Sequence, residues 1–405
     1  MKTSNRFVYA VIGVIVLLLA GQVYAWSVMG SVINREFHWD AAQLSLCFTI
    51  VMAMFCVGCL IAGAAAKKLS PKVFLVLSGC LFLSGFLLSS FTTDTPVLLY
   101  LGFGVCSGLG VGFAYNAVMS SMSRWFPDKQ GLISGVMLMG FGLSSFLVGK
   151  LFVAVTPETD PSAWRITFRV LGIVIFLGMF LCGIFFQKPA ADFKPPVSSE
   201  KIVKEPALDI DSKKMLKKSA FWYYYVWTVV ISAAGLVLVS QANGIAAQVG
   251  TGISASAIAT VVGLVSIMNG IGRVIFGGLF DKKGNRFTMI LDMILFLAAG
   301  LILIAAIRTN LFPLIIAGFL TGGFAYGGVT PTNSAIISDF FGRTHYPVNF
   351  SIINTNLIIA SFASTIAGKL YDASGSYLTS LFLIILLTVL GFVALIGVRR
   401  PAEKI

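Results

Sequence analysis

The stretch Gly270–Arg286 reads GIGRVIFGGLFDKKGNR, and it joins a long apolar run to a short, charged loop. The run begins near residue 254, and Arg273 is the charged residue inside it. About 20 mostly apolar residues are enough for a helix to cross a bilayer, so the length of the run predicts a membrane span. An arginine within a span is costly and usually faces a cavity or a partner. The stretch therefore predicts both a membrane helix and a functional site on it.

The composition extends this prediction to the whole chain. Of the 405 residues, 57% are hydrophobic and 11% are charged, whereas about a quarter of the residues in a soluble domain are charged. The net charge of +13 does not indicate nucleic-acid binding, because the basic residues lie in short loops between apolar runs. We predict an all-α membrane protein with twelve transmembrane helices, near residues 7–33, 42–66, 71–91, 97–122, 130–155, 164–186, 220–248, 254–280, 286–308, 312–338, 346–371 and 376–398.

A polar stretch divides these helices into two groups of six. Gln187–Ser219 contains four prolines, mixed charges and few large apolar side chains, which is typical of a linker. The predicted domains are a six-helix bundle over 1–186, a linker over 187–219 and a second six-helix bundle over 220–405. The six cysteines fall in or at the edges of apolar runs, where we expect them to pack; neither a metal site nor a cofactor is expected.

The distribution of lysine and arginine orients the chain. The two termini and the even-numbered loops carry 22 of these residues, and the odd-numbered loops with their flanks carry six. Because loops rich in Lys and Arg tend to stay in the cytoplasm, both termini and the linker are predicted to be cytoplasmic. We therefore expect a multi-pass protein of the plasma (inner) membrane.

The two halves of the sequence repeat one another. GQVYAW from Gly21 aligns with GLVLVS from Gly235, which lies 214 positions later. GAAAKKLSPK over 63–72 aligns with GGLFDKKGNR over 277–286 at the same offset. Several matches at one offset indicate a duplicated six-helix unit, and hence two pseudo-symmetric bundles. Such repeats are typical of transporters that alternate access around a site near the middle of the membrane.

The loop GGLFDKKGNR resembles the signature of the major facilitator superfamily, G-x-L-x-D-[RK]-x-G-x-[RK]. The first-half counterpart is degenerate, because Lys67 stands at the acidic position. The chain also resembles the oxalate/formate antiporter branch, which is related to the monocarboxylate transporters, in GQVYAWSV, AYNAVMSSMSRWFPDKQGLISG, MLKKSAFW, NGIGR and DFFG. The resemblance implies the major facilitator fold and the transport of small carboxylates.

The same resemblance implies a role for Arg273. In this branch an arginine of helix 8 is the partner of the anion, and Arg273 matches that position. The branch uses a second basic residue, a lysine of helix 11, when the substrate is the oxalate dianion. Here helix 11 contains no basic residue before Lys369, near its outer end. This departure favours a monoanion, and a guanidinium is well suited to bind one carboxylate because it stays charged and presents a planar fork of donors.

A structural ion pair is the alternative for Arg273. The acids that could pair with Arg273 all lie away from the middle of the membrane. Asp292 lies in helix 9 near its cytoplasmic end, Asp281 and Asp339 lie at the membrane surface, and Glu36 lies outside helix 1. Asp292 itself is expected to be structural, paired with cations of the loops, and proton coupling is its alternative role.

Further candidate residues come from the cavity-lining helices and the cytoplasmic loops. Aromatic rings and amides there can wall a small acid and donate hydrogen bonds to it. The predicted substrate-binding residues are Arg273, Tyr24, Tyr115, Trp26, Asn269, Tyr326 and Asn354. The loop residues are expected to form charged latches, with a solvated loop as the alternative; the predicted gating residues are Gly277, Asp281, Lys282, Gly284, Arg286, Arg124, Asp128, Asp339 and Arg343.

We predict a secondary active or facilitative transporter of small monocarboxylates of the formate, lactate or pyruvate type. It is expected to act as a monomer in the bilayer by alternating access, with a counter-anion or a proton as a further partner. The alternatives are an oxalate or other dicarboxylate exchanger, or a transporter of non-carboxylate cargo such as a sugar. An enzyme is not expected: His38 and His345 lie near helix ends, and no nucleophile–base pair or metal cluster is visible.

Overall fold

The computed structural model describes residues 5–39, 41–156, 160, 162–189 and 206–401, and every regular element within these ranges is helical. In this part of the chain, twelve helical segments are long and apolar enough to cross a membrane. They begin with Arg6–Ala25 and end with Leu378–Gly397, and one segment matches each predicted apolar run. The prediction of an all-α chain with twelve spans is confirmed.

The helices form two compact units. Unit 1 contains the described residues of Met1–Asp128, Gly140–Val203 and Tyr346–Asn354, and unit 2 those of Lys129–Met139, Lys204–His345 and Thr355–Ile405. The division at the linker 187–219, predicted from the sequence, therefore differs from the compact units in two short segments. One is the first part of α7 (Gln130–Val155), and the other is α14 (Tyr346–Asn354).

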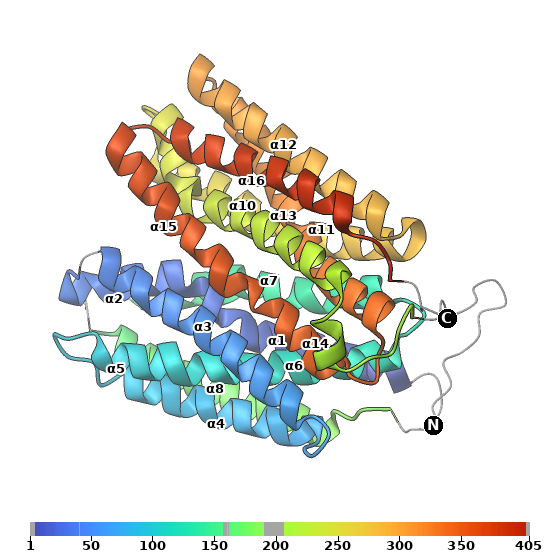
Figure 1. Cartoon of the computed structure of the whole chain (residues 1–405). Helices are drawn as coiled ribbons and strands as arrows, with labels where there is room; N and C mark the ends of the chain where they lie inside the picture. Colours follow the sequence, from blue (N-terminus) through green and yellow to red (C-terminus); the bar gives the residue numbers. More distant parts are fainter. Residues whose placement is uncertain (1–4, 40, 157–159, 161, 190–205, 402–405) are drawn as a thin grey trace. The chain divides into compact units, whose positions relative to one another are not determined.

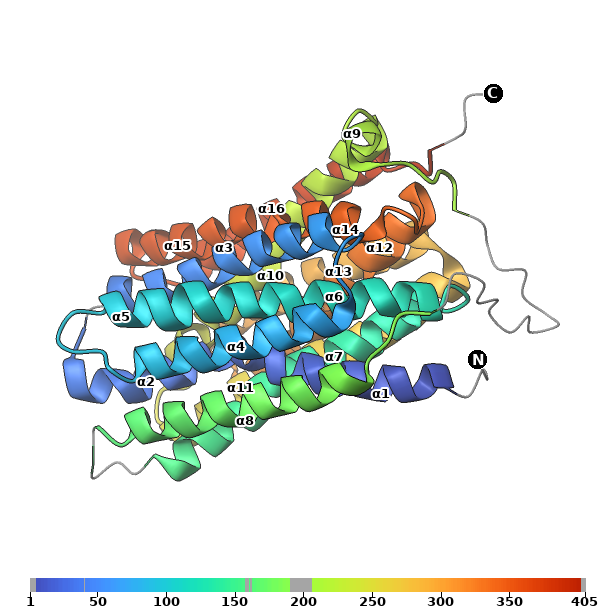
Figure 2. The ribbon, with the colours of Figure 1, turned by 90° about the horizontal axis from the view of Figure 1, so that it is seen from below.

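In unit 1, α4 packs beside α8 and α3 packs beside α6 (Figure 2). Glycine allows the second contact to be close, because a Cβ atom on Gly108 of α6 would lie only 2.8 Å from the carbonyl oxygen of Val51 on α3. Besides the later part of α7, the elements of unit 1 are α1 (Asn5–Ala20), η1 (Gly21–Ala25), α2 (Trp26–Phe37), α3 (Ala41–Ala65), α4 (Pro71–Ser89), α5 (Val97–Leu99), η2 (Tyr100–Ser107), α6 (Gly108–Trp125), α8 (Trp164–Phe185) and α14.

In unit 2, α13 packs against α10, α11 and α12, and α10 also packs against α16 (Figure 1). The glycines of α13 bring its backbone close to α11, since a Cβ atom on Gly323 would lie 2.9 Å from the Cα atom of Val265. Besides the first part of α7, the elements of unit 2 are α9 (Ser212–Met215), α10 (Ser219–Val249), α11 (Ala255–Lys283), α12 (Asn285–Thr309), α13 (Phe312–Phe341), α15 (Asn356–Ser374) and α16 (Leu378–Gly397).

Polar contacts explain why α14 belongs to unit 1. Asn116 of α6 donates from Nδ2 to the carbonyl oxygen of Pro347 at 2.9 Å and to Ser351 Oγ at 2.8 Å. Ser351 Oγ donates in turn to the carbonyl oxygen of Cys59 on α3 at 2.7 Å. These groups are buried, where a hydrogen bond left unmade is costly, so they hold α14 on α3 and α6.

A turn or break interrupts two of the helices predicted to be continuous, and the predicted helix 97–122 includes the π-helical segment η2. The first span passes from α1 through the 3-10 turn η1 into α2, and Gly21 at this turn packs directly on the carbonyl group of Phe141. The eleventh span breaks at Thr355, between α14 and α15, within the run Asn354–Asn356. Short polar side chains of this kind compete with the helix for hydrogen bonds. Here Tyr225 and Thr355 share a hydrogen bond of 2.7 Å through their hydroxyl groups, and Ser232 donates to Asn356 Oδ1 at 2.9 Å.

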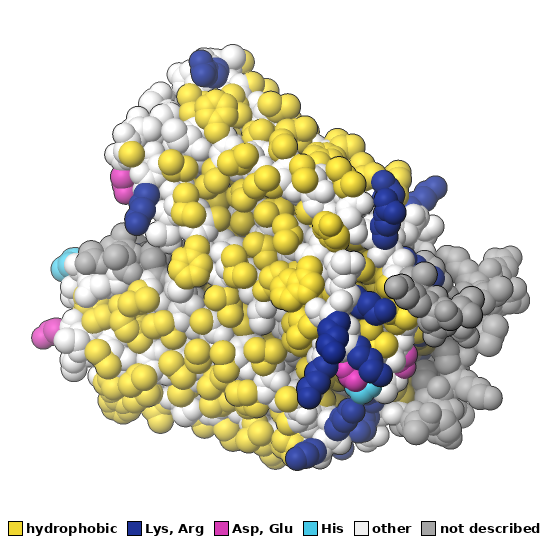
Figure 3. All heavy atoms as spheres, viewed as in Figure 1, with side chains coloured by type: hydrophobic (Ala, Val, Ile, Leu, Met, Phe, Trp, Pro, Cys, Tyr) yellow, Lys and Arg dark blue, Asp and Glu magenta, His cyan; other side chains and the backbone are white. Residues whose placement is uncertain are grey.

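The outer faces of the spans are apolar. Exposed large side chains recur along α8 and α16, for example Ile166, Val170, Val393 and Ile396. Hydrophobic side chains cover much of the face shown in Figure 3, and most of the Lys and Arg side chains visible there gather on its right-hand side. Apolar outer faces of this kind are suited to contact with lipid tails.

Candidate functional site

Arg273 is buried in α11 of unit 2, with 5% of its surface exposed. Its Nε donates to Asn269 Oδ1 at 2.8 Å, one helical turn earlier on α11. Its Nη1 donates to the carbonyl oxygen of Leu138 in α7 at 2.6 Å. Two neutral acceptors thus fix the orientation of the guanidinium without neutralising its charge. Among the described residues, Nη2 makes no hydrogen bond, so donors remain for an anion.

The acids considered as structural partners of Arg273 are engaged elsewhere or buried apart from it. In the described part of the chain, no carboxylate forms an ion pair with Arg273. Glu36 pairs with Arg165, and Asp339 pairs with Arg400 at 3.0 Å. Asp281 accepts from backbone N–H groups of α7, at 2.8 Å for each oxygen. The structural ion pair is therefore not found among these acids.

Asp292 departs from its expected pairing with loop cations. Its side chain is buried in α12, and neither carboxyl oxygen has a hydrogen-bond partner among the described residues. Oδ1 lies over the backbone of α13, where a Cβ atom on Gly328 would approach it to 2.6 Å. The expectation was wrong because the side chain faces α13, not the loop.

Asn269 and Arg273 lie against the backbone of α13. A Cβ atom on Gly327 would approach the backbone nitrogen of Arg273 to 2.8 Å and would overlap the carbonyl oxygen of Asn269. Tyr326, the predicted substrate-binding residue on α13, is also buried. Its ring packs on Gly235 of α10. Unit 2 thus brings Arg273 and Asn269 into direct contact, while the ring of Tyr326 packs on α10.

The rings of Tyr24 and Tyr115, the two predicted substrate-binding tyrosines of unit 1, both contact one phenylalanine. Phe141 of α7 lies 5.3 Å from Tyr24 and 5.5 Å from Tyr115, measured between ring centroids. Tyr115 is also stacked on Phe350 of α14 at 5.6 Å. Tyr24 is half-buried and Tyr115 is buried. Phe141 is not among the residues predicted from the sequence, because no local pattern relates α7 to these helices.

Trp26 and Asn354 are also buried in unit 1. Trp26 packs against Phe103 with ring centroids 5.0 Å apart, and its Nε1 donates to the carbonyl oxygen of Leu44 at 3.0 Å. The indole N–H of Trp26 is thus already hydrogen-bonded within unit 1. The carbonyl oxygen of Asn354 accepts from Cys56 Sγ at 3.4 Å, and its Nδ2 has no hydrogen-bond partner among the described residues.

Asp281, in the last turn of α11, holds the start of α7. Asp281 accepts from the backbone N–H groups of Gly131 and Leu132, in the first turn of α7. These groups have no partner within their own helix, and the positive end of the helix dipole favours a carboxylate there. Gly277 lies one turn before Asp281, and its backbone packs directly on Gly131.

The other residues of the predicted gating motif lie at or beside the tight turn between α11 and α12. Gly284 has a φ of +81°, a conformation that favours glycine, and its carbonyl oxygen accepts from Thr288 Oγ1 at 2.8 Å. Lys282 and Arg286 are exposed.

The other predicted latch residues pair mainly with residues near the chain ends. Asp128 forms an ion pair with Arg6 at 2.9 Å in unit 1, and Asp339 forms one with Arg400 in unit 2. Arg343 donates from Nε to Ser338 Oγ at 3.2 Å, and Arg124 is half-buried beside a small pocket of unit 1.

A polar cluster that was not predicted from the sequence joins α7 to α13, where Ser134 and Ser334 share a hydrogen bond of 2.6 Å.

The variant Asp281→Asn tests the clamp on α7. It removes the negative charge and one of the two acceptors, at a cost of about 1 kcal/mol because the site is exposed. We expect faster hydrogen–deuterium exchange in the first turn of α7, and slower transport. Asp372→Asn, which removes another exposed acid, is the control and should leave this exchange unchanged. Equal protection of α7 in Asp281→Asn and in the unmodified protein would contradict the clamp.

Comparisons with known proteins agree with this architecture. A model of the Major Facilitator Superfamily matches residues 11–355 and, in a second match, 239–405. The chain is 27% identical to the oxalate:formate antiporter of Oxalobacter formigenes over 351 residues, which cover 85% of this chain and 80% of that protein. It is 25% identical to monocarboxylate transporter 13 of Rattus norvegicus over 348 residues, which cover 85% of this chain and 77% of that protein.

The fold also matches a solved structure. The structure of the proton:xylose symporter XylE bound to 6-bromo-6-deoxy-D-glucose aligns with a TM-score of 0.72 and 15% identity. The alignment covers 98% of this chain and 95% of that chain. At this identity the likeness concerns the fold alone.

Proposed function

Because the chain belongs to the major facilitator superfamily, it is a multi-pass membrane transporter rather than an enzyme, and we propose that it carries small monocarboxylate anions. The observation that carries the proposal is Arg273, a buried cation with no carboxylate partner among the described residues. A charge buried without a counter-ion is expensive, and a carboxylate substrate would remove that cost each time it binds.

The contacts of Arg273 support a carboxylate as the ligand. Asn269 and the carbonyl oxygen of Leu138 take one donor each from Nε and Nη1, which leaves N–H groups on Nη1 and Nη2. These groups can donate to the two oxygens of one carboxylate in the bidentate geometry that guanidinium favours. The names of two relatives, an oxalate:formate antiporter and a monocarboxylate transporter, point to the same class of cargo.

Helix 11 supports a monoanion over oxalate. Its first basic residue, Lys369, lies in α15 and is exposed, while the buried positions before it are apolar or neutral. A dianion would bring a second negative charge into the site, and Arg273 alone would leave that charge uncompensated. Formate, lactate and pyruvate carry one charge at neutral pH and avoid this cost. Oxalate, another dicarboxylate and non-carboxylate cargo remain the alternatives.

We propose that transport follows alternating access, with Tyr24, Tyr115, Trp26, Tyr326 and Asn354 contributing to the walls of the pathway. Binding of the anion neutralises Arg273, which makes the occluded intermediate less costly. A counter-anion or a proton completes the cycle. The protein is proposed to act as a monomer in the plasma membrane with both termini in the cytoplasm, in agreement with the excess of Lys and Arg in the termini and even-numbered loops.

Uptake into proteoliposomes tests this function. Purified protein is reconstituted and supplied with labelled formate, acetate, lactate, pyruvate or oxalate, each with and without an internal anion and an imposed pH gradient. We expect a monoacid to be taken up fastest, and the dependence on internal anion or pH gradient separates exchange from proton coupling. Oxalate as the best substrate would overturn the preference for a monoanion. Absence of uptake for every acid, by protein shown to be folded, would overturn carboxylate transport.

A further inference from the structure

A groove of about 610 Å³ lies in unit 2 between the start of α10 and the end of α16, and we infer that it binds one anionic phospholipid. The groove combines an apolar wall on the membrane side with a basic rim where the two helices leave the membrane. The residues that line it include Lys218 and Tyr223 from the α10 side, and Val393, Ile396 and Arg399 from the α16 side.

The apolar wall is suited to acyl chains. The exposed fractions are 50% for Tyr223, 60% for Val393 and 68% for Ile396. These side chains belong to membrane spans, so the medium that faces them is lipid. The ring of Tyr223 lies directly over Gly397, where a Cβ atom would overlap it, and both residues line the groove. Tyrosine at the membrane boundary is also favoured, because its ring packs on acyl chains while its hydroxyl group reaches the headgroups.

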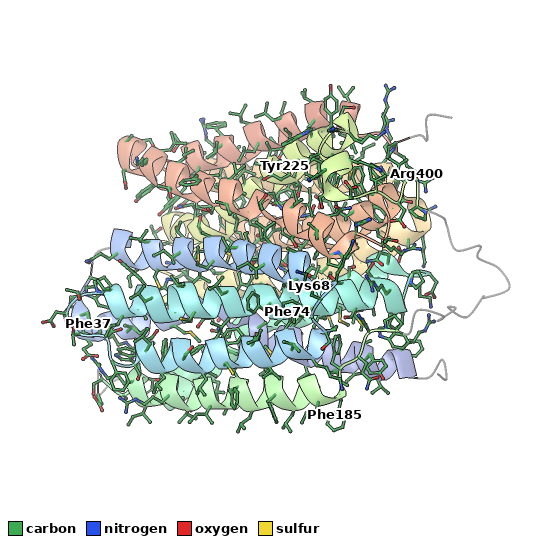
Figure 4. All side chains as sticks on the ribbon, turned by 60° about the horizontal axis from the view of Figure 1, so that its bottom comes forward. Phe37, Lys68, Phe74, Phe185, Tyr225 and Arg400 are labelled. Carbon is green, nitrogen blue, oxygen red and sulfur yellow. The ribbon has the colours of Figure 1, made fainter. Side chains whose placement is uncertain are left out.

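The rim is suited to a negative headgroup. Lys218, Arg399 and Arg400 line it, and Arg400 is partly neutralised by its ion pair with Asp339. No ion pair is formed by Lys218 or Arg399 within the described part of the chain. Figure 4 labels Arg400 near the end of the helices of unit 2. Lys213, Lys214 and Lys217 on and after α9 add positive charge just before the groove.

A phospholipid fits this combination better than a free anion does. A phosphate ion would use the rim but would leave the apolar wall unoccupied, whereas a lipid fills both regions. A zwitterionic lipid would fill the wall equally well but would gain less from the rim. Basic pockets between helices at a membrane boundary are a recognised setting for anionic lipid headgroups.

Native mass spectrometry of the full-length protein in detergent tests the inference. Phosphatidylglycerol and phosphatidylcholine with identical acyl chains are titrated separately, and then inorganic phosphate is added to the phosphatidylglycerol complex. We expect one phosphatidylglycerol to be retained preferentially and phosphate not to displace it. Equal retention of the two lipids would overturn the inference, and displacement by phosphate would assign the rim to a free anion. This comparison needs no variant.

The double variant Lys218→Gln/Arg399→Gln locates the lipid. Each basic residue near the membrane surface contributes about a fivefold gain, so the loss of two predicts roughly 30-fold weaker retention of phosphatidylglycerol. Lys67→Gln/Lys68→Gln removes the same charge from two exposed residues after α3 and is the matched control. An equal loss of lipid in both double variants, or in neither, would contradict the assignment to this groove. Failure of this test leaves the proposed carboxylate transport untouched.

Discussion

Replacing Arg273 with Gln is expected to abolish uptake of the preferred monocarboxylate while leaving the protein folded. Loss of one partner from a buried, hydrogen-bonded charge pair costs about 2–5 kcal/mol. This cost corresponds to a loss in substrate affinity of roughly 30-fold to more than 1,000-fold. Glutamine keeps hydrogen-bonding ability and much of the length of the side chain but carries no charge, so the variant isolates the electrostatic part of binding.

The stability of Arg273→Gln separates the substrate role from a structural one. The charge is buried in α11 without an ionic partner among the described residues. A charge in a span costs about 2.5–3.5 kcal/mol on insertion scales, so its removal is expected to leave the melting temperature unchanged or to raise it. A variant that loses both transport and stability would point to a structural role. Undiminished uptake by a folded variant would remove Arg273 from the site.

Arg273→Lys is the matched charge-conserving variant. Lysine keeps the positive charge but cannot present the planar fork of donors that binds two carboxylate oxygens together. It also cannot reproduce the Nε bond to Asn269 and the Nη1 bond to Leu138 in the same geometry. We expect uptake intermediate between that of Arg273→Gln and that of the unmodified protein, measured as initial rates over a range of substrate concentrations. Equal rates for Arg273→Lys and Arg273→Gln would mean that geometry matters more than charge.

The sequence was sufficient for the features that depend on local patterns. Apolar length alone predicted the twelve spans, because a helix must carry about 20 apolar residues to cross a bilayer. The contact between Asn269 and Arg273 also follows from the sequence, since residues four apart share one face of a helix.

The features that depend on tertiary packing could not be predicted from the sequence. The bond from Arg273 to the carbonyl oxygen of Leu138 joins residues 135 positions apart, and any residue type at 138 offers that acceptor. Phe141 joins Tyr24 to Tyr115 through ring contacts that no periodicity encodes. The pairing of Asp339 with Arg400 was hidden because several acids and bases lie at the same membrane boundary, where charge alone does not select a partner.

The close packing of α7 on α11 makes Gly277→Ala the second variant with a large expected effect. A Cβ atom at position 277 would overlap the carbonyl oxygen of Gly131 and lie 2.7 Å from its carbonyl carbon. Backbone atoms cannot move aside as a flexible side chain can, so the two helices must separate. Overpacking of this kind costs about 1–3 kcal/mol. Separation would also displace Asp281 from the first turn of α7, because Asp281 lies one turn after Gly277 on the same helix.

Gly278→Ala provides a control one residue away on the same helix. Its Cβ atom would meet only Leu132 Cδ1, at 3.6 Å, which is an ordinary contact. Alanine is favoured over glycine in a helix by about 1 kcal/mol, so Gly278→Ala should be stabilising or neutral. We expect thermal unfolding in detergent to show a lower melting temperature for Gly277→Ala and an unchanged or higher one for Gly278→Ala, with uptake lost only in the former. Equal melting temperatures and equal uptake in the two variants would mean that the direct backbone contact between α7 and α11 limits neither stability nor transport. The gating role predicted for Gly277 would then be wrong.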